Sequence, residues 1–152
     1  VTQTTNALTH IYTQGWPEGI RLDATGALYD KTIDAQTLLG LGAADMVNGN
    51  TELVFHNGKL GGPVSVKSLN VILSKVVKIP TTNKSFTLTF TQATGLMSGT
   101  FTPNWTQPNK ILPKFQGVLF KKGLKKAALG FFISNRLSDL DPESGSVTII
   151  TP

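Results

Sequence analysis

The chain has 152 residues, of which 39% are hydrophobic and 15% are charged, and its net charge is +5. This length suits one domain with a hydrophobic core, and a charged fraction below the average of about 25% argues against intrinsic disorder. The absence of cysteine excludes disulfides and thiolate metal sites, and no apolar run reaches the roughly 18 residues of a membrane-spanning helix. Because the sequence begins at Val1, we expect a processed mature form or an excised domain, from which a signal peptide could have been removed.

The charges are unevenly distributed along the chain. Residues 1–52 hold six acidic and two basic residues, a net charge of −4, whereas residues 53–136 hold twelve basic residues and no acidic one, a net charge of +12. Residues 137–152 add three acidic residues, a net charge of −3. Such segregation can steer an acidic partner toward the protein, or folding can mix the segments so that the surface averages out.

The first predicted elements follow a polar, threonine-rich stretch. Residues 1–10 are predicted to be flexible or to form an arm donated to a neighbouring molecule. A short helix is predicted within DAQTLLGLGAADM, residues 34–46, where glycines weaken it. TELVFHNGKL, residues 51–60, is predicted to form two strands around a turn at Asn57 and Gly58, since Asn-Gly is the strongest short hairpin signal.

Period-two patterns dominate the middle of the chain. SLNVILSKVVKI, residues 68–79, is predicted to form one strand that ends at Pro80. SFTLTFT, residues 85–91, alternates most clearly and predicts a half-buried antiparallel strand with its phenylalanines and leucine on one face. ATGLMSGTFT, residues 93–102, is predicted to begin with a turn at Thr94 and Gly95 and to continue as a strand.

The last predicted strands surround a lysine-rich turn. KFQGVLF, residues 114–120, and LGFFIS, residues 129–134, flank that turn, and SGSVTIITP, residues 144–152, predicts a final strand with Val147 and Ile149 on one face. The phenylalanines of these strands are predicted to lie in the core, namely Phe115, Phe120, Phe131 and Phe132. The chain as a whole, residues 1–152, is predicted to be a single all-β domain, an antiparallel sandwich or a closed barrel of about eight to ten strands.

Several ordered motifs resemble a known family. YTQGWPEGIRLDATGALYD, NTELVFHNGKL, ATGLMSGTFT, KFQGVLFKKG, LGFFIS and SGSVTI are similar to segments of an uncharacterised β-domain at the carboxyl end of large exported planctomycete and verrucomicrobial surface proteins. The matching positions are Trp16, Pro17, Gly19, Gly26, Tyr29, Gly58, Thr94, Gly95, Leu96, Ser98, Gly99, Phe101, Phe115, Gly117, Val118, Gly130, Phe131, Phe132, Ser144, Gly145 and Val147. The resemblance implies an exported, noncatalytic module located outside the cell or on its surface. The lysine-rich turn and the loop of residues 102–113 depart from the family pattern.

Enzymatic chemistry finds little support in the sequence. His10 and His56 are the only histidines, and no Gly-x-Ser-x-Gly nucleophile elbow accompanies them. The acidic pairs that a two-carboxylate hydrolase would need, such as Glu18 with Asp23, lie in predicted surface loops. No phosphate-binding loop or dinucleotide fingerprint is present. We therefore expect a protein that is not an enzyme and that requires no cofactor.

Two stretches offer weak calcium candidates. Oxygen ligands clustered in a loop suit calcium, but the same residue types are ordinary turn formers, and neither stretch has the spacing of a known calcium loop. The candidate ligands are Asp45, Asn48, Asn50 and Glu52 in the first stretch and Asp139, Asp141 and Glu143 in the second.

Two tryptophans lie in proline-containing loops. Trp16 lies in GWPEG and Trp105 in PNWTQP. An exposed tryptophan can stack on a sugar ring, which predicts a carbohydrate-binding module, or it can close one end of a barrel or sandwich. The family resemblance favours the closing role for Trp16, and both roles stay open for Trp105.

The lysine-rich turn has three interpretations. Its four central lysines are Lys121, Lys122, Lys125 and Lys126. They are the solvated tip of a hairpin, or they contact an acidic partner such as a polysaccharide or a neighbouring copy of the protein. Nucleic acid is not expected, because the nearby phenylalanines are predicted to be core rather than exposed between the charges. A terminal strand, from residues 1–10 or 146–152, could add to a neighbour's sheet edge.

The sequence-based hypothesis is thus a noncatalytic exported surface module that supports adhesion or protein assembly. The alternative is a carbohydrate-binding module that uses the loop tryptophans. No membrane insertion is expected.

Overall fold

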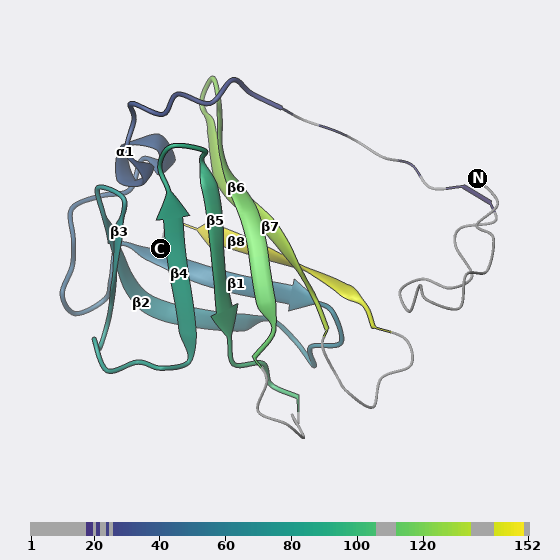
Figure 1. Cartoon of the computed structure of the whole chain (residues 1–152). Helices are drawn as coiled ribbons and strands as arrows, with labels where there is room; N and C mark the ends of the chain where they lie inside the picture. The colour runs from purple at the N-terminus through teal and green to yellow at the C-terminus, as the bar shows by residue number, and fades with distance from the viewer. Residues whose placement is uncertain are drawn as a thin grey trace.

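The computed structural model describes residues 18–19, 21, 24, 26–105, 112–134 and 142–150, with all their side chains except those of residues 65–68 (Figure 1). This part of the chain contains eight strands and one short helix, which confirms the all-β prediction at the lower end of the expected strand count. The elements are α1 (Ala35–Leu39), β1 (Thr51–Asn57), β2 (Val64–Ile72), β3 (Lys75–Lys78), β4 (Phe86–Thr91), β5 (Leu96–Phe101), β6 (Lys114–Lys122), β7 (Lys125–Ile133) and β8 (Ser144–Ile150).

All eight strands belong to one antiparallel sheet. Their order is β3-β2-β1-β8-β7-β6-β5-β4, so the last strand pairs with the first and every other neighbour in the sheet is also a neighbour in sequence. The sheet therefore curls into a nearly closed up-and-down barrel rather than two packed sheets. Its only unpaired seam lies between β3 and β4, within the described residues.

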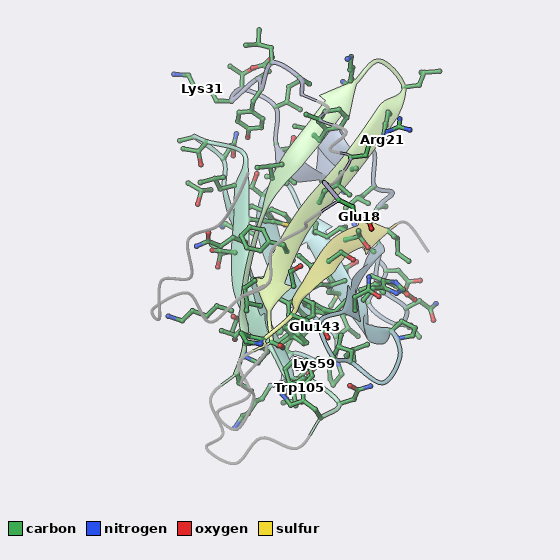
Figure 2. The ribbon with its side chains drawn as sticks, turned by 90° about the vertical axis from the view of Figure 1, so that its right-hand side faces the viewer. Glu18, Arg21, Lys31, Lys59, Trp105 and Glu143 are labelled. Carbon is green, nitrogen blue, oxygen red and sulfur yellow. The ribbon has the colours of Figure 1, made fainter. Side chains whose placement is uncertain are left out.

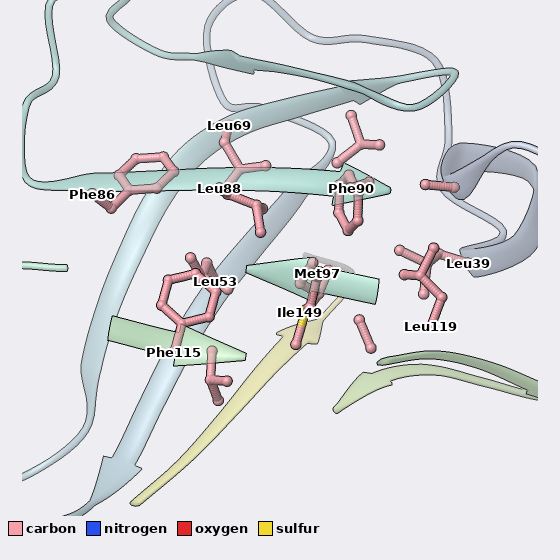
Figure 3. Close-up of a cluster of buried hydrophobic side chains, with 14 of the residues drawn as sticks. Leu39, Leu53, Leu69, Phe86, Leu88, Phe90, Met97, Phe115, Leu119 and Ile149 are labelled. Carbon is pink, nitrogen blue, oxygen red and sulfur yellow. The ribbon is translucent and has the colours of Figure 1, made fainter. Parts of the chain in front are cut away.

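Large and small residues alternate inside the barrel. One inward row runs across β5 to β8 as Met97, Gly117, Gly130 and Val147, and the next row runs as Gly99, Phe115, Phe132 and Gly145. A Cβ added at Gly145 would collide with the Phe132 ring, and one at Gly117 would collide with the Met97 methyl group. The glycines therefore make the space that the large side chains fill, as the narrow bore of a small barrel requires. Figure 3 shows Leu39 of α1 near Leu119 in this core.

The two ends of the barrel are closed differently. We call the end that carries α1 and the β2–β3, β4–β5 and β6–β7 turns the helix end, and the opposite end the tryptophan end. Ala35, Leu38 and Leu39 of α1 are buried in the core at the helix end. At the tryptophan end the half-buried Trp105 packs against the core. Figure 2 shows Lys31 at the helix end, and Lys59 with Trp105 at the other.

The turn predicted at Asn57 and Gly58 is part of a longer loop. β1 ends at Asn57, one residue into the predicted turn, and the next strand starts only at Val64. Three successive residues adopt left-handed backbone angles, with φ of 62° at Asn57, 59° at Gly58 and 62° at Lys59. The remaining loop residues bring the chain back to the sheet, where Val64 at the start of β2 pairs with Phe55 of β1.

The prediction of one strand over residues 68–79 is wrong. A tight turn at Leu73 and Ser74 divides this segment into β2 and β3, which pair with each other. Leu73 adopts φ of 57°, which is unusual for a leucine. Helix α1 holds this turn: the Leu73 N–H donates to Gln36 Oε1 (2.9 Å), and the Leu73 carbonyl accepts from the Gln36 N–H (2.8 Å). The turn thus depends on a tertiary contact with a segment more than thirty residues away.

The predicted helix is present but short. The Asp34 side chain caps its first turn by accepting a hydrogen bond from the Thr37 N–H (2.9 Å). Gly40 ends it with φ of 69°, a left-handed conformation that glycine adopts without strain. The expected weakening by glycine therefore takes the form of termination after five residues.

The final strand is present, but it is not an edge. Val147 and Ile149 are buried on one face of β8, as predicted. β8 pairs with β1 on one side and with β7 on the other, so the prediction of an exposed terminal strand within residues 146–152 is wrong for residues 146–150, and residues 151–152 lie outside the described residues. Residues 1–10, the other candidate arm, lie outside the described residues.

Two of the four predicted core phenylalanines lie outside the core cluster. Phe115 and Phe132 are part of that cluster, whereas Phe131 is 55% exposed and Phe120, although buried, follows the inward Leu119 in β6 and is not part of it. Phe131 and Phe132 are consecutive in β7, and consecutive side chains of a strand point to opposite faces, so only one of them can fill the barrel. The four lysines also differ from the prediction, because they lie in β6 and β7 rather than in a loop, and only Gly123 and Leu124 form the turn.

Candidate binding surfaces

The interior of the barrel is filled by its own side chains. Phe55 stacks on Phe101 at 3.8 Å between ring centroids, and the edges of Phe115 and Phe132 approach it at 5.2 and 6.0 Å. These rings occupy the space in which larger barrels hold a ligand. The candidate binding surfaces therefore lie on the outside of the barrel.

The first candidate is the lysine hairpin, which we define as residues 121–126. Lys121 lies directly opposite Lys126, and Lys122 opposite Lys125, and all four side chains are exposed. Like charges in direct cross-strand pairs destabilise a sheet. Figure 1 shows the hairpin reaching beyond the neighbouring β4–β5 turn at the helix end. At its tip, Gly123 adopts φ of 60° and the Leu124 side chain is fully exposed.

One acidic residue from the first part of the chain, Asp30, lies near this hairpin. The positive charge of Lys121 contributes to a lowered pKa of Asp30, although the hydrogen bonds from the Thr32 hydroxyl and N–H are the larger causes. The Lys126 side chain lies against Gly40 at the end of α1. Folding therefore mixes part of the negative segment with the positive one, as one of the two interpretations of the charge pattern predicted.

The second candidate, the outer apolar strip, consists of Leu96, Val118, Leu129 and Phe131. Leu96, Val118 and Leu129 lie side by side on β5, β6 and β7, with Phe131 two residues further along β7. They are 49%, 47%, 45% and 55% exposed, respectively. A shallow hollow of about 280 Å³ lies over the strip. The sequence held a signal for it, since these apolar residues alternate with inward ones, but glycines at the inward positions obscured which face was the core.

A second hollow of about 350 Å³ continues from the strip toward the helix end. Leu39 and Leu41 line it on one side, and Leu129 and Ile150 on the other, while Lys126 forms part of its lining. Leu129 borders both hollows, so the strip and this groove form a continuous outer surface.

Trp105 is placed in the closing role. Its ring lies edge-on to Phe101 and tilted against Phe132, each at 6.4 Å between centroids. The indole Nε1 is buried and donates to no acceptor among the described residues. An indole packed in this way offers part of its surface to the core rather than to a sugar. Trp16 lies outside the described residues.

The first calcium candidate forms a structural turn. The Asp45 carboxylate accepts hydrogen bonds from the Val47 N–H and from the N–H and side chain of Asn48, and these bonds lower the pKa of Asp45. The buried Asn50 amide donates to the Gly42 and Val71 carbonyls and accepts from the Val71 N–H. The Asp45 carboxylate and the Asn50 side-chain amide are therefore already used in hydrogen bonds within the protein.

The remaining acidic and histidine candidates are dispersed. Glu52 lies in β1 and His56 at its exposed end, while Glu143 precedes β8 and its backbone pairs with Ser134. Among the described residues, no three histidine or acidic side chains come together as a metal site would require. Asp139, Asp141, His10 and Asp23 lie outside the described residues.

The barrel seam is bridged by a lysine. Lys78 of β3 donates to the Phe86 carbonyl of β4 (3.3 Å), and its amine lies 5.6 Å from the centre of the Phe86 ring. Charged side chains on edge strands oppose pairing with another chain. Here the Lys78 amine also donates to a carbonyl of the opposite edge strand, which is then less available to another chain. We therefore do not count the seam as a binding surface.

None of the helices within the described ranges is long and apolar enough to cross a membrane. Comparisons of the chain with protein-family models, with curated proteins and with solved structures found no match. The resemblance to exported β-domains therefore stays a prediction, and function must be inferred from the surfaces themselves.

Proposed function

We propose that this chain is a noncatalytic module that assembles with further copies of itself through the outer apolar strip. The observation that carries the proposal is the row of large apolar side chains on three neighbouring strands, each about half exposed in the monomer. Contiguous apolar patches of this kind mark interaction surfaces, whereas isolated exposed apolar residues do not. Removal of such side chains from water favours association.

The surroundings of the strip suit a contact between identical faces. The next outward row consists of Ser98, Gln116 and Ser146 around Phe131, and none of these residues is charged. Two copies can therefore stack strip against strip without burying an unpaired charge, which would cost several kcal/mol, of the order of 3 to 5. Antiparallel faces stack about 10 Å apart, and a two-fold axis would place each strip on its counterpart.

The wider role is adhesion or assembly at a cell surface, where the sequence resemblance would place the module. Carbohydrate binding, the alternative, receives less support because Trp105 packs against Phe101 and Phe132. Protease accessibility of the natural protein on intact cells would test the exported location, since a protein retained inside would be protected.

Analytical ultracentrifugation over a wide concentration range tests assembly. We expect dimers or larger species in the wild-type protein that persist in high salt, because the contact is apolar. The double variant Val118→Thr, Phe131→Thr should be monomeric, and Val47→Thr, at an exposed apolar residue outside the strip, should assemble normally. A strictly monomeric wild-type protein at high concentration would refute the proposal. Dimers that dissociate in salt and ignore the strip variants would instead place the contact on the lysine hairpin.

A further inference from the structure

Exposed apolar residues are unequally distributed between the two ends of the barrel. At the helix end, Leu124 is 100% exposed and Leu28 is 99% exposed, and Leu73 in the β2–β3 turn is 62% exposed. The described loops of the tryptophan end carry no exposed large apolar side chain. The helix end therefore presents leucines to solvent at its extremities, while the other end does not.

Leu124 has no structural role that requires leucine. Gly123 supplies the left-handed residue of the two-residue turn, and Leu124 follows at a position where glycine, asparagine, serine or aspartate is more usual. The side chain is fully exposed, so it contributes nothing to the core. Its exposure therefore calls for a partner outside the barrel.

Leu28 lies on a segment fixed beside the same hairpin. The next residue, Tyr29, donates its hydroxyl to the Gln92 carbonyl (2.7 Å) and lies against Gly95 in the β4–β5 turn. After the hydrogen bonds from Thr32, the positive charge of Lys121 is a further cause of the lowered pKa of Asp30. Figure 1 shows this segment crossing the helix end close to the tip of the β6–β7 hairpin. Two exposed leucines thus project from neighbouring parts of one end.

Positive charge surrounds these leucines. The segment of residues 26–40 and the lysine hairpin together hold five lysines and two aspartates, a net charge of +3. Both aspartates are engaged as hydrogen-bond acceptors, Asp30 by Thr32 and Asp34 by Thr37. An anionic partner would relieve the repulsion between the opposed lysine pairs, which nothing in the hairpin itself offsets.

We propose that the helix end docks onto an anionic lipid surface, with Leu124 and Leu28 entering the interface and the lysine hairpin contacting lipid phosphates. Clustered lysines are attracted to anionic leaflets, and exposed apolar side chains gain from entering the boundary with the acyl chains. The barrel would then stand end-on to the surface. The outer apolar strip, on the barrel wall, would remain available for assembly.

Other polyanions explain only half of these features. An acidic polysaccharide would engage the lysines but would give two fully exposed leucines no apolar environment. Single-stranded nucleic acid would need aromatic side chains between the charges. The exposed Phe131 lies five residues from Lys126 along β7, about 17 Å away in an extended strand, and it belongs to the outer apolar strip.

Flotation of the protein with lipid vesicles tests the proposal. We expect binding to vesicles of phosphatidylcholine with about 30% phosphatidylglycerol, weakening as salt rises, and little binding to phosphatidylcholine alone. Leu124→Ser should weaken binding about tenfold, the loss expected when one leucine no longer enters the interface. The triple variant Lys121→Gln, Lys122→Gln, Lys125→Gln should weaken it about a hundredfold, since each lysine contributes roughly a factor of five. Lys126 is retained because it packs against Gly40.

A matched control removes the same charge from the tryptophan end. The triple variant Lys59→Gln, Lys84→Gln, Lys114→Gln lowers the net charge equally but should reduce vesicle binding no more than a few-fold. Circular dichroism and thermal unfolding confirm that each variant is folded. Phe131→Thr should keep vesicle binding even if it abolishes assembly, so this proposal and the proposed function can fail separately.

Four outcomes would overturn the proposal. Equal binding to neutral and anionic vesicles, or equal losses in the two lysine triples, would show that the hairpin has no specific role. Full binding by Leu124→Ser would remove the leucine from the contact. Capture of heparin or single-stranded DNA, unaffected by Leu124→Ser and without vesicle binding, would identify the hairpin as a site for an acidic polymer.

Discussion

The core of this barrel is covered by different residues at its two ends. At the tryptophan end, rings carried by the strands and by Trp105 fill the bore, and the described apolar side chains there are largely covered. At the helix end, a helix of five residues covers the core, while leucines and lysines on the surrounding turns remain exposed. The difference indicates that the tryptophan end contributes mainly stability and that the helix end is available for contact.

Removal of an aromatic ring from the tryptophan end should cause the largest loss of stability. Phe132→Ala should lower the free energy of unfolding by about 3 to 5 kcal/mol, because it leaves a cavity beside Phe55, Phe101 and Trp105. Phe131→Ala, at the adjacent outward residue, should cost less than about 1 kcal/mol. Urea unfolding measures both values. Similar losses in the two variants would contradict the assignment of inward and outward faces.

A methyl group added at a glycine of the tryptophan end should lower the free energy of unfolding by less than the loss of the Phe132 ring. Gly145→Ala would place a methyl group against the Phe132 ring and the His56 carbonyl, so we expect a loss of about 1 to 3 kcal/mol in the free energy of unfolding. Ser146→Ala, at the next residue of β8, is the control and should be nearly neutral. Unchanged stability of Gly145→Ala would mean that the bore is wider than the packing indicates.

At the helix end, loss of the helix cap should have a moderate and local effect. Asp34→Ala removes the acceptor for the Thr37 N–H and hydroxyl, and we expect a loss of about 1 kcal/mol in the free energy of unfolding. Asp34→Asn should retain most of the stability, since asparagine also caps helices well. Hydrogen exchange should show faster opening at Leu38 and Gln36 than in β6. Uniformly faster exchange across the barrel would show that α1 is not an independent cover.

The smallest predicted effect is the pH dependence of that cap. Hydrogen bonds from Thr37 hold the pKa of Asp34 below its ordinary value, so its carboxylate contributes stability above the unfolded pKa and loses it as the pH falls through the folded one. We therefore expect the Asp34→Asn variant to lose less stability than the wild-type protein below about pH 4. Thermal unfolding at pH 3 and pH 6 measures the difference. Parallel losses in both proteins would assign the acid sensitivity to other carboxylates.

The sequence pattern predicts the structure best where one face of a strand is wholly apolar. The alternation of Phe86, Leu88 and Phe90 predicted β4, and both its inward and its outward residues are as expected. The pair Val147 and Ile149 did the same for β8. Of the candidate binding residues, the four lysines could be located from the sequence, and their exposure follows from their charge. Their exact cross-strand pairing could not be, because it depends on a turn of only two residues.

Other features depended on contacts between distant segments. The sequence by itself determined an all-β chain, a short helix within residues 34–46 and the approximate positions of most strands, because alternation and turn residues act over a few neighbours. Only the tertiary structure decided that Leu73 turns the chain beneath α1, that β8 pairs with β1, and that Phe131 faces outward while Phe132 fills the bore. These choices follow from strand register and from the limited space inside the barrel, which residues far apart in the sequence define together.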